Sequence, residues 1–222
     1  MVCMSAKAMS PNAKSTTPIP LAERRTQKER KQAAETAIIR AAVTIIATKG
    51  LGGLTLAAAG EMAGYSRGIA SHHFGKKDDL LIAIVNHITS TFSRLLAQDS
   101  NIKPGMPMLL RVIDRYLGDM EEQSQYVCAL QLIMTEAVSN PTIRPALEKV
   151  NERSVQGLVV HIRRAIVDGE IAIVVDANTQ ALLLLTNLRG LLGHYLVNPK
   201  GFNLAVVRRE LIKNLKRNLG AT

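Results

Sequence analysis

The sequence predicts an all-α protein of about nine helices, with a small three-helix N-terminal part ahead of a larger helical part. Aromatic residues make up only 3% of the 222 residues and Trp is absent, whereas Ala, Leu and Ile are plentiful. This balance favours helices packed through aliphatic side chains over a β-sandwich or barrel. Apolar residues also recur at helical spacing along most of the chain, and the apolar content of 47% is ordinary for a globular protein.

The N-terminal part is predicted to hold a disordered arm and a long first helix. Residues 1–22 are rich in Ser, Thr and Pro and lack apolar periodicity, so we expect them to be disordered. A helix is predicted over 26–49, where alanine and isoleucine side chains share one face and Gly50 follows the last turn.

Two short helices and a third, longer one follow. The short helices are predicted over 55–63 and 66–74, with Gly64 in the turn between them and polar N-cap residues, Thr55 and Ser66, at their starts. Gly75 ends the second short helix. The longer helix begins near Lys77 and carries two aspartates in its first turn, where negative charge is favourable.

The remainder is predicted to be helical throughout. Five further helices are expected over 108–122, 124–138, 142–168, 178–197 and 203–218. The one β-like run, Ile171–Val175, is too short to form a sheet alone. We therefore divide the chain into an arm (1–22), a first domain (23–76) and a second domain (77–222).

Charge and cysteine content narrow the class of protein. The net charge is +6 over residues 1–80, −1 over 81–199 and +5 over 200–222, so the two ends suit a polyanion or are solvated tails. Cys3 and Cys128 match no metal spacing, which indicates a reduced, cytoplasmic chain. We expect no signal peptide, membrane span, metal or cofactor, and the absence of a phosphate loop or nucleophile elbow argues against an enzyme.

The stretch TLAAAGEMAGYSRGIASHHF, residues 55–74, is a helix-turn-helix candidate. Close crossing of the two helices needs a small residue in the first, which Gly60 supplies. The sharp turn needs a residue that tolerates positive φ, which Gly64 supplies four residues later. An ordinary corner between two helices would use glycine in the same way, so the spacing alone leaves both interpretations open.

The surrounding residues resemble the DNA-binding domain of the TetR (tetracycline repressor) family of bacterial transcriptional regulators. The matching features, which extend over residues 28–96, are Lys49–Gly50, Leu54–Thr55, Ala63–Gly64, Ser66-x-Gly68, His73–Phe74 and Lys77-x-x-Leu80. The chain departs from the pattern at Ala70–Ser71, where family members commonly carry Leu-Tyr, and at Gly60, where they prefer Ala. Ser71 thus lacks the aromatic ring that commonly touches DNA in the family.

The resemblance implies that the helix from Ser66 to Phe74 enters the major groove of double-stranded DNA. We expect Arg67 to read a base, Gly68 to let the backbone approach, and Ile69 and Ser71 to touch a thymine methyl and a base edge. The expected phosphate contacts are Thr55, His72, His73 and Lys77. Corner packing, capping or simple solvation would account for the same residues. The basic residues before and within the first helix (Arg24, Arg25, Lys28, Arg30, Lys31) would reach DNA or only solvate the arm.

The same resemblance implies that the second domain binds a small molecule and dimerises through its last two helices. Residues that suit a ligand pocket are Tyr116, Met120, Cys128, Met134 and Asn187. Residues that suit the dimer interface are Leu188, Leu192, Leu211 and Leu215. Core packing within the subunit is the alternative for both sets, and Arg189 and His194 fit either a ligand site or an interface.

The leading functional hypothesis is therefore a homodimeric transcriptional repressor that a small apolar or amphipathic effector releases from its operator. The alternative is an architectural DNA-binding protein that needs no ligand. We further expect the helix over 77–97 to be the one segment that couples the recognition helix to the sensor domain.

Overall fold

A computed structural model describes residues 26–222 except 100, 123, 173, 175, 202 and 222. The described residues form nine α-helices and no strand, as the sequence predicts. The helices are α1 (Gln27–Lys49), α2 (Leu56–Met62), α3 (Arg67–Phe74), α4 (Lys77–Gln98), α5 (Met106–Glu122), α6 (Ser124–Ser139), α7 (Arg144–Val167), α8 (Ala177–Val197) and α9 (Leu204–Leu219). The expected arm, 1–22, lies outside the described residues.

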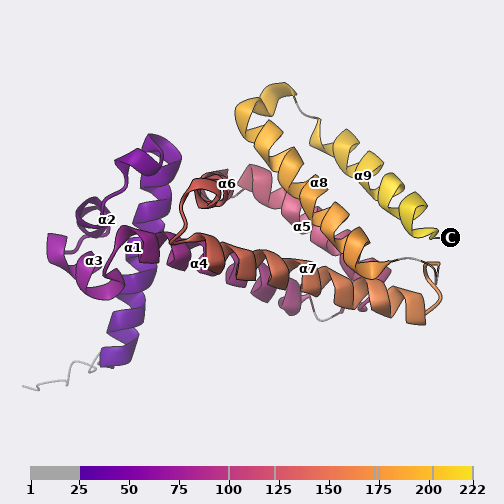
Figure 1. Ribbon diagram of the computed structural model, residues 1–222, viewed down its shortest axis with the longest axis horizontal. Coiled ribbons are helices and arrows are strands. Elements are labelled where there is room, and N and C mark those ends of the chain that lie inside the picture. Colours follow the sequence, from indigo (N-terminus) through magenta and orange to yellow (C-terminus); the bar gives the residue numbers. More distant parts are fainter. Residues whose placement is uncertain are drawn as a thin grey trace, which may run out of the picture.

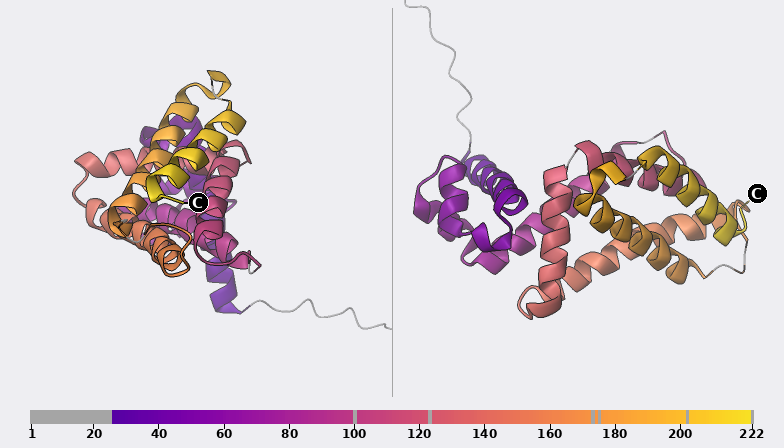
Figure 2. Two further views of the ribbon diagram at one scale, coloured as in Figure 1. Left: turned by 90° about the vertical axis from the view of Figure 1, so that its right-hand side faces the viewer. Right: turned by 90° about the horizontal axis from the view of Figure 1, so that it is seen from above.

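Helices α1–α3 gather at one end of an elongated molecule, and α4 leads from them into the rest (Figure 1). Helix α7 runs beside α4, and α8 and α9 form the far side together with α5 (Figures 1 and 2). The described residues of the β-like run do not form a strand. Ile171 is buried in the core, and the Ala172 amide donates to the carbonyl of Leu219 at 3.0 Å, which holds this loop against the end of α9.

Local signals set the ends of α1. Thr26 and Glu29 form a capping box, in which the Thr26 amide donates to the Glu29 carboxylate at 2.7 Å and the Glu29 amide donates to the Thr26 hydroxyl at 3.2 Å. Gly50 ends the helix at φ +69°, a conformation that glycine adopts without strain. The chain then makes one short 3-10 turn, Leu51–Gly53, and enters the α2–α3 corner.

The first hydrophobic core joins helices α1–α3 to the helices beyond them. Ile38, Ile45 and Ile46 of α1 pack in one cluster with Leu80 of α4 and Ile133 of α6, and all are at most 2% exposed. The start of α7 contributes Leu147 and Val150 to the same cluster. Helix α4 contacts the recognition helix α3, and α6 and α7 in addition share a core with α1, so more than α4 connects the two parts.

The second core lies among α5, α7, α8 and α9. Its largest fully buried side chains include Leu109, Ile113 and Met120 of α5. Helix α4 is apolar and long enough to cross a membrane by length and composition. Its first half is instead buried in the first core, through Leu80, Leu81, Ile84 and Val85, and its second half faces the cavity described below.

Candidate DNA interface and effector cavity

The α2–α3 corner has the close helix contact and the sharp turn that its two glycines predict. A Cβ on Gly60 would lie 3.2 Å from the carbonyl oxygen of Ser66 and 3.5 Å from the Cβ of Ala70, so only a very small residue fits. Gly64 has φ +82°, and the amide of Tyr65 donates to the Gly60 carbonyl at 2.9 Å. Ala70 is fully buried in the corner. The orientation of α3 on α2 therefore depends on these small residues.

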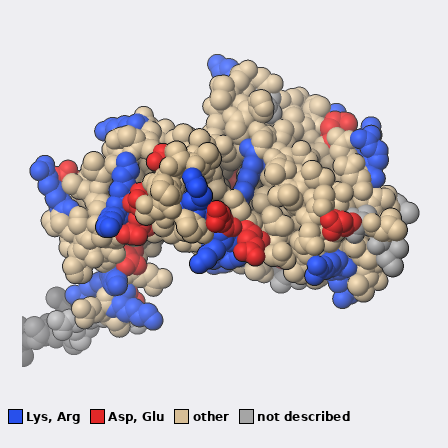
Figure 3. All heavy atoms as spheres, in the orientation of Figure 1, with Lys and Arg blue, Asp and Glu red and all other residues tan. Residues whose placement is uncertain are grey.

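One face of α3 is exposed. It carries two pairs of residues one turn apart, Arg67 with Ser71 and Gly68 with His72. All four residues are exposed. Ser66 precedes them, also exposed, with no side-chain hydrogen bond to the helix start. Ile69 is half-buried and packs against the first core, so it is less accessible than the residues beside it. Lysine and arginine side chains stand out over this end of the molecule (Figure 3).

Arg67 is ion-paired in the free protein. Its guanidinium Nε lies against the carboxylate of Glu61 on α2, and the Arg67 side chain is 80% exposed while that of Glu61 is 49% exposed. The pair joins the two helices of the corner on their outer side. The pair uses Nε, so the two Nη groups of Arg67 can bind a base while Glu61 holds the side chain in place.

Three of the expected phosphate contacts are engaged within the protein. The His73 side chain is only 9% exposed, and its Nδ1 lies 3.3 Å from a carboxylate oxygen of Glu35 on α1. The Lys77 ammonium donates to the carbonyl of Leu51 at 2.6 Å, and the Thr55 hydroxyl accepts from the Ala58 amide at 3.0 Å as the N-cap of α2. These contacts stabilise the module in this conformation. His73 and Lys77 are partly buried, whereas Thr55 is exposed while it caps the helix.

Besides Arg67, His72 and Lys76 are exposed basic residues at the recognition helix and just after it. His72 is exposed on α3, and Lys76 is exposed at the N-cap position of α4. The phosphate contacts expected from the sequence include Lys77, which belongs to the family motif, and do not include Lys76. The signal that could have separated them is the helix start, since the N-cap residue lies outside the first turn and its side chain is freer.

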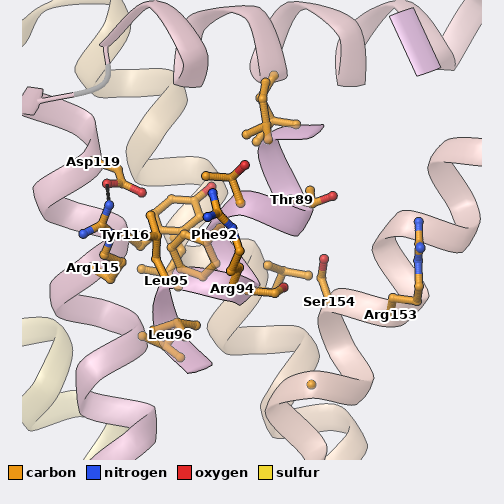
Figure 4. A pocket seen from close by; sticks show the side chains of 18 of the residues that line it. Thr89, Phe92, Arg94, Leu95, Leu96, Arg115, Tyr116, Asp119, Arg153 and Ser154 are labelled. Carbon is orange, nitrogen blue, oxygen red and sulfur yellow. Dashed lines mark ion pairs between the residues drawn. The ribbon is translucent and has the colours of Figure 1, made fainter. Parts of the chain in front are cut away.

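A cavity of about 650 Å³ lies between α4, α5, α6, α7 and α8, and Arg40 of α1 reaches its edge. Its apolar lining includes Phe92, Leu158 and Leu188, and the rings of Phe92 and Tyr116 meet edge to face with centroids 6.0 Å apart (Figure 4). The volume is in the range of sites for small organic molecules. The site thus has both the size and the apolar walls that such a ligand needs.

Several polar groups in the cavity wall lack partners among the described residues. The Tyr116 hydroxyl and the His161 Nδ1 are buried with no hydrogen-bond partner there. Burial raises the pKa of Tyr116 to about 12 and lowers the pKa of His161 below its ordinary value, so both rings are neutral near pH 7. Burial also lowers the pKa of Arg189, a half-buried residue whose guanidinium donates to the Asn151 amide oxygen at 2.8 Å.

The sequence matches a known family over the corner and the helices that flank it. The profile of the family described as "Bacterial regulatory proteins, tetR family" matches residues 38–84, which run from α1 through the recognition helix into α4. Residues 38–84 therefore form a DNA-binding domain of the TetR type.

Curated relatives and solved structures agree with this TetR assignment. The regulator CymR of Pseudomonas putida is 29% identical over 133 residues, which are 60% of this chain and 64% of CymR. BetI of Burkholderia mallei (strain NCTC 10229) is 30% identical over 122 residues, covering 52% of this chain and 60% of BetI. The chain thus spans about three-fifths of the length of these curated relatives.

Two TetR-like folds illustrate the structural likeness. A TetR-family regulator from Rhodococcus sp. superposes with a TM-score of 0.77 at 24% identity, covering 85% of this chain and 99% of that one. The regulator FadR from Bacillus subtilis, solved in complex with stearoyl-CoA, gives a TM-score of 0.75 at 20% identity, with coverage of 82% and 98%. The fold is therefore shared over both cores.

Of the residues expected to line a ligand pocket, Tyr116 lies in the cavity wall. Met120 is fully buried in the second core, and Met134 packs against the first. Cys128 is half-buried on α6, where burial raises the pKa of its thiol, and Asn187 is exposed on α8. Met120 and Met134 thus fill gaps between packed helices, whereas Met108, which was not among the expected pocket residues, lines the cavity.

The residues expected at the TetR dimer interface lie in the core of the subunit. Leu188 and Leu192 are each 1% exposed and Leu215 is 6% exposed, all within the second core, and Leu211 packs against it half-buried. The apolar side chains that α8 and α9 leave in solvent are different ones. They are Leu182, Leu183 and Val197 on α8 and Val206 on α9.

Proposed function

We propose that this TetR-family protein is a regulator of transcription, not an enzyme, that binds an operator as a homodimer and is released by a small molecule in the α4–α8 cavity. The observation that carries the proposal is the exposed face of α3, formed by Arg67, Gly68, Ser71 and His72. Its side chains and backbone are free to approach a major groove, which is wide enough for a helix. Repression follows if the operator overlaps a promoter, and the site of action is the bacterial cytoplasm, where the DNA is.

DNA binding and effector binding are assigned to different parts of the chain. Residues 23–76 read DNA and residues 77–222 sense the effector and dimerise. The cavity supports the sensing role because it pairs apolar walls with unsatisfied buried polar groups, which is the usual composition of a small-molecule site. FadR of the same fold, in complex with stearoyl-CoA, is a precedent for a bound small molecule.

Dimerisation is supported by an apolar stripe on the outer face of α8. Leu183, Gly190 and Val197 recur every seven residues on this face, and Leu183 and Val197 are 46% and 87% exposed. A Cβ on Gly190 would meet nothing within 4 Å, so a partner helix has room to approach there. A twofold dimer would present two α3 helices to half-sites about 34 Å apart along one side of the DNA.

Fluorescence anisotropy with two labelled duplexes tests the DNA assignment. One duplex carries the region upstream of the protein's own gene, and the other is a shuffled duplex of equal length and composition. We expect binding to the first to be at least about a thousandfold tighter at physiological salt. Equal binding to both would instead support an architectural DNA-binding protein.

A further inference from the structure

The cavity wall carries an excess of positive charge. Five arginines line it, namely Arg40, Arg94, Arg115, Arg153 and Arg189, against a single acidic residue, Asp119. Asp119 is occupied by Arg115, whose guanidinium lies 3.1 Å from its carboxylate. A cationic ligand would meet this surplus of arginines at close range. The charge of the wall therefore favours an anion.

Among the cavity arginines without an acidic partner, Arg189 is the most buried. Among the residues that the structure describes, no carboxylate lies within 4 Å of its guanidinium, and Arg189 donates instead to the neutral Asn151 side chain. A guanidinium has five donors arranged as a planar fork. Partial burial of a guanidinium costs hydration free energy, and a hydrogen bond to a neutral partner recovers little of that cost.

Tyr116 supplies a second donor next to this charge. Its hydroxyl is buried without a partner among the described side chains and backbone, and Arg189 is close enough to act on it electrostatically. Tyr116 comes from α5 and Arg189 from α8, so a group bound by both would join two helices across the cavity. Phe92, Leu158 and Leu188 surround the polar pair with apolar surface.

We infer that the effector is a carboxylate with an apolar body, whose carboxylate is bound by Arg189 and Tyr116 and whose body packs against Phe92, Leu158 and Leu188. The inference deepens the proposed function and rests on it. A carboxylate matches the planar fork of the guanidinium, and its negative charge balances the positive charge of Arg189. The Tyr116 hydroxyl then donates to the same group, which satisfies the buried oxygen.

Isothermal titration with matched acids and amides tests this assignment. The probes are decanoate and decanamide, for a chain-like body, and 2-naphthoate and 2-naphthamide, for a flat body. In each pair the apolar part is constant and only the charge changes. We expect at least one of the acids to bind about tenfold to a hundredfold tighter than its amide, because a charged hydrogen bond contributes more than a neutral one.

Variants identify the residues responsible. Arg189→Gln should remove the preference for the acid, and Tyr116→Phe should reduce it. Arg217→Gln is the matched control, since it removes one positive charge from α9 away from the cavity and should leave the preference unchanged. The far-ultraviolet circular dichroism of each variant establishes that it is folded.

Three results would overturn the assignment: amides that bind as well as acids, an acid preference that persists in folded Arg189→Gln, or no binding by any of the four probes. The titration uses no DNA, so it is independent of the regulatory role. Acid binding that leaves operator affinity unchanged would refute the proposed function and retain the carboxylate site. Loss of operator binding on adding the acid would support both.

Discussion

Leu183→Glu should dissociate the dimer while leaving the subunit folded. Leu182 and Leu183 are 51% and 46% exposed, so about half of each side chain is available for burial by a partner. Complete burial of a leucine contributes roughly 1.5–3 kcal/mol, and the available half therefore contributes about 1 kcal/mol. Twofold symmetry counts each residue twice, so the substitution removes about 2 kcal/mol of apolar stabilisation.

The introduced charge adds a second penalty. Each new carboxylate enters the interface without a partner, and an unsatisfied buried polar group costs about 1–3 kcal/mol. Taking the low end for the two copies gives a total loss of about 4 kcal/mol, which corresponds to a roughly thousandfold rise in the dimer Kd. Sedimentation velocity over a concentration series measures this change, and circular dichroism reports whether the helices persist.

Two controls separate the interface from the core. Val167→Glu places the same charge at a side chain 78% exposed on α7 and should leave the dimer intact. Leu192→Ala removes a side chain 1% exposed in the second core, so it should lower the unfolding free energy by about 2–5 kcal/mol without dissociating the folded dimer. If Leu183→Glu sedimented as a folded dimer of unchanged affinity, the stripe on α8 would not be the interface.

Three further predictions concern DNA and pH. Arg67→Ala should weaken binding to the specific duplex by about 1–3 kcal/mol and relax the preference at one base pair, whereas an equal loss on shuffled DNA would exclude a base-reading role. Lys76→Ala should lower the slope of log K against log salt by about one unit; Lys77→Ala should instead lower the melting temperature, because it removes the bond to the Leu51 carbonyl. Burial lowers the pKa of His161, so the stability that its neutral ring provides is present above the unfolded pKa of about 6.5 and lost as pH falls below that value. Urea unfolding should therefore show a smaller loss of stability between pH 7.5 and 5 for His161→Gln than for the wild type, and equal losses would contradict the assignment.

Features determined by near neighbours in the chain could be predicted from the sequence. The α2–α3 corner is one, because Gly60 and Gly64 act within a few residues of themselves through sterics and backbone conformation. Helix starts are another. Asp176 accepts from the Thr179 amide at 3.1 Å and Asn203 from the Val206 amide at 3.1 Å, so each caps the helix that it precedes.

Contacts between distant segments could not be read from the pattern. The carbonyl that binds Lys77 belongs to Leu51, 26 residues earlier, and Glu35 beside His73 lies 38 residues earlier. Helix α8 is apolar nearly all round, so its periodicity does not say that Leu188 and Leu192 turn inward while Leu183 remains outside. The side-chain charge of Arg189 was visible in the sequence, but its position in the cavity wall depends on how α5, α7 and α8 pack.

The shared first core determines how an effector could act on DNA. An effector changes DNA affinity only if it binds one arrangement of the dimer better than the other. Helices α4 and α6 line the cavity and also pack against α1, α7 shares their core, and the Thr44 hydroxyl of α1 lies 3.2 Å from the Gln125 side chain of α6. We therefore expect a movement of α4 or α6 to shift α1 and, with it, the α2–α3 corner. The coupling between effector and operator is then distributed over this core and, by linkage, each ligand must weaken the other by the same factor.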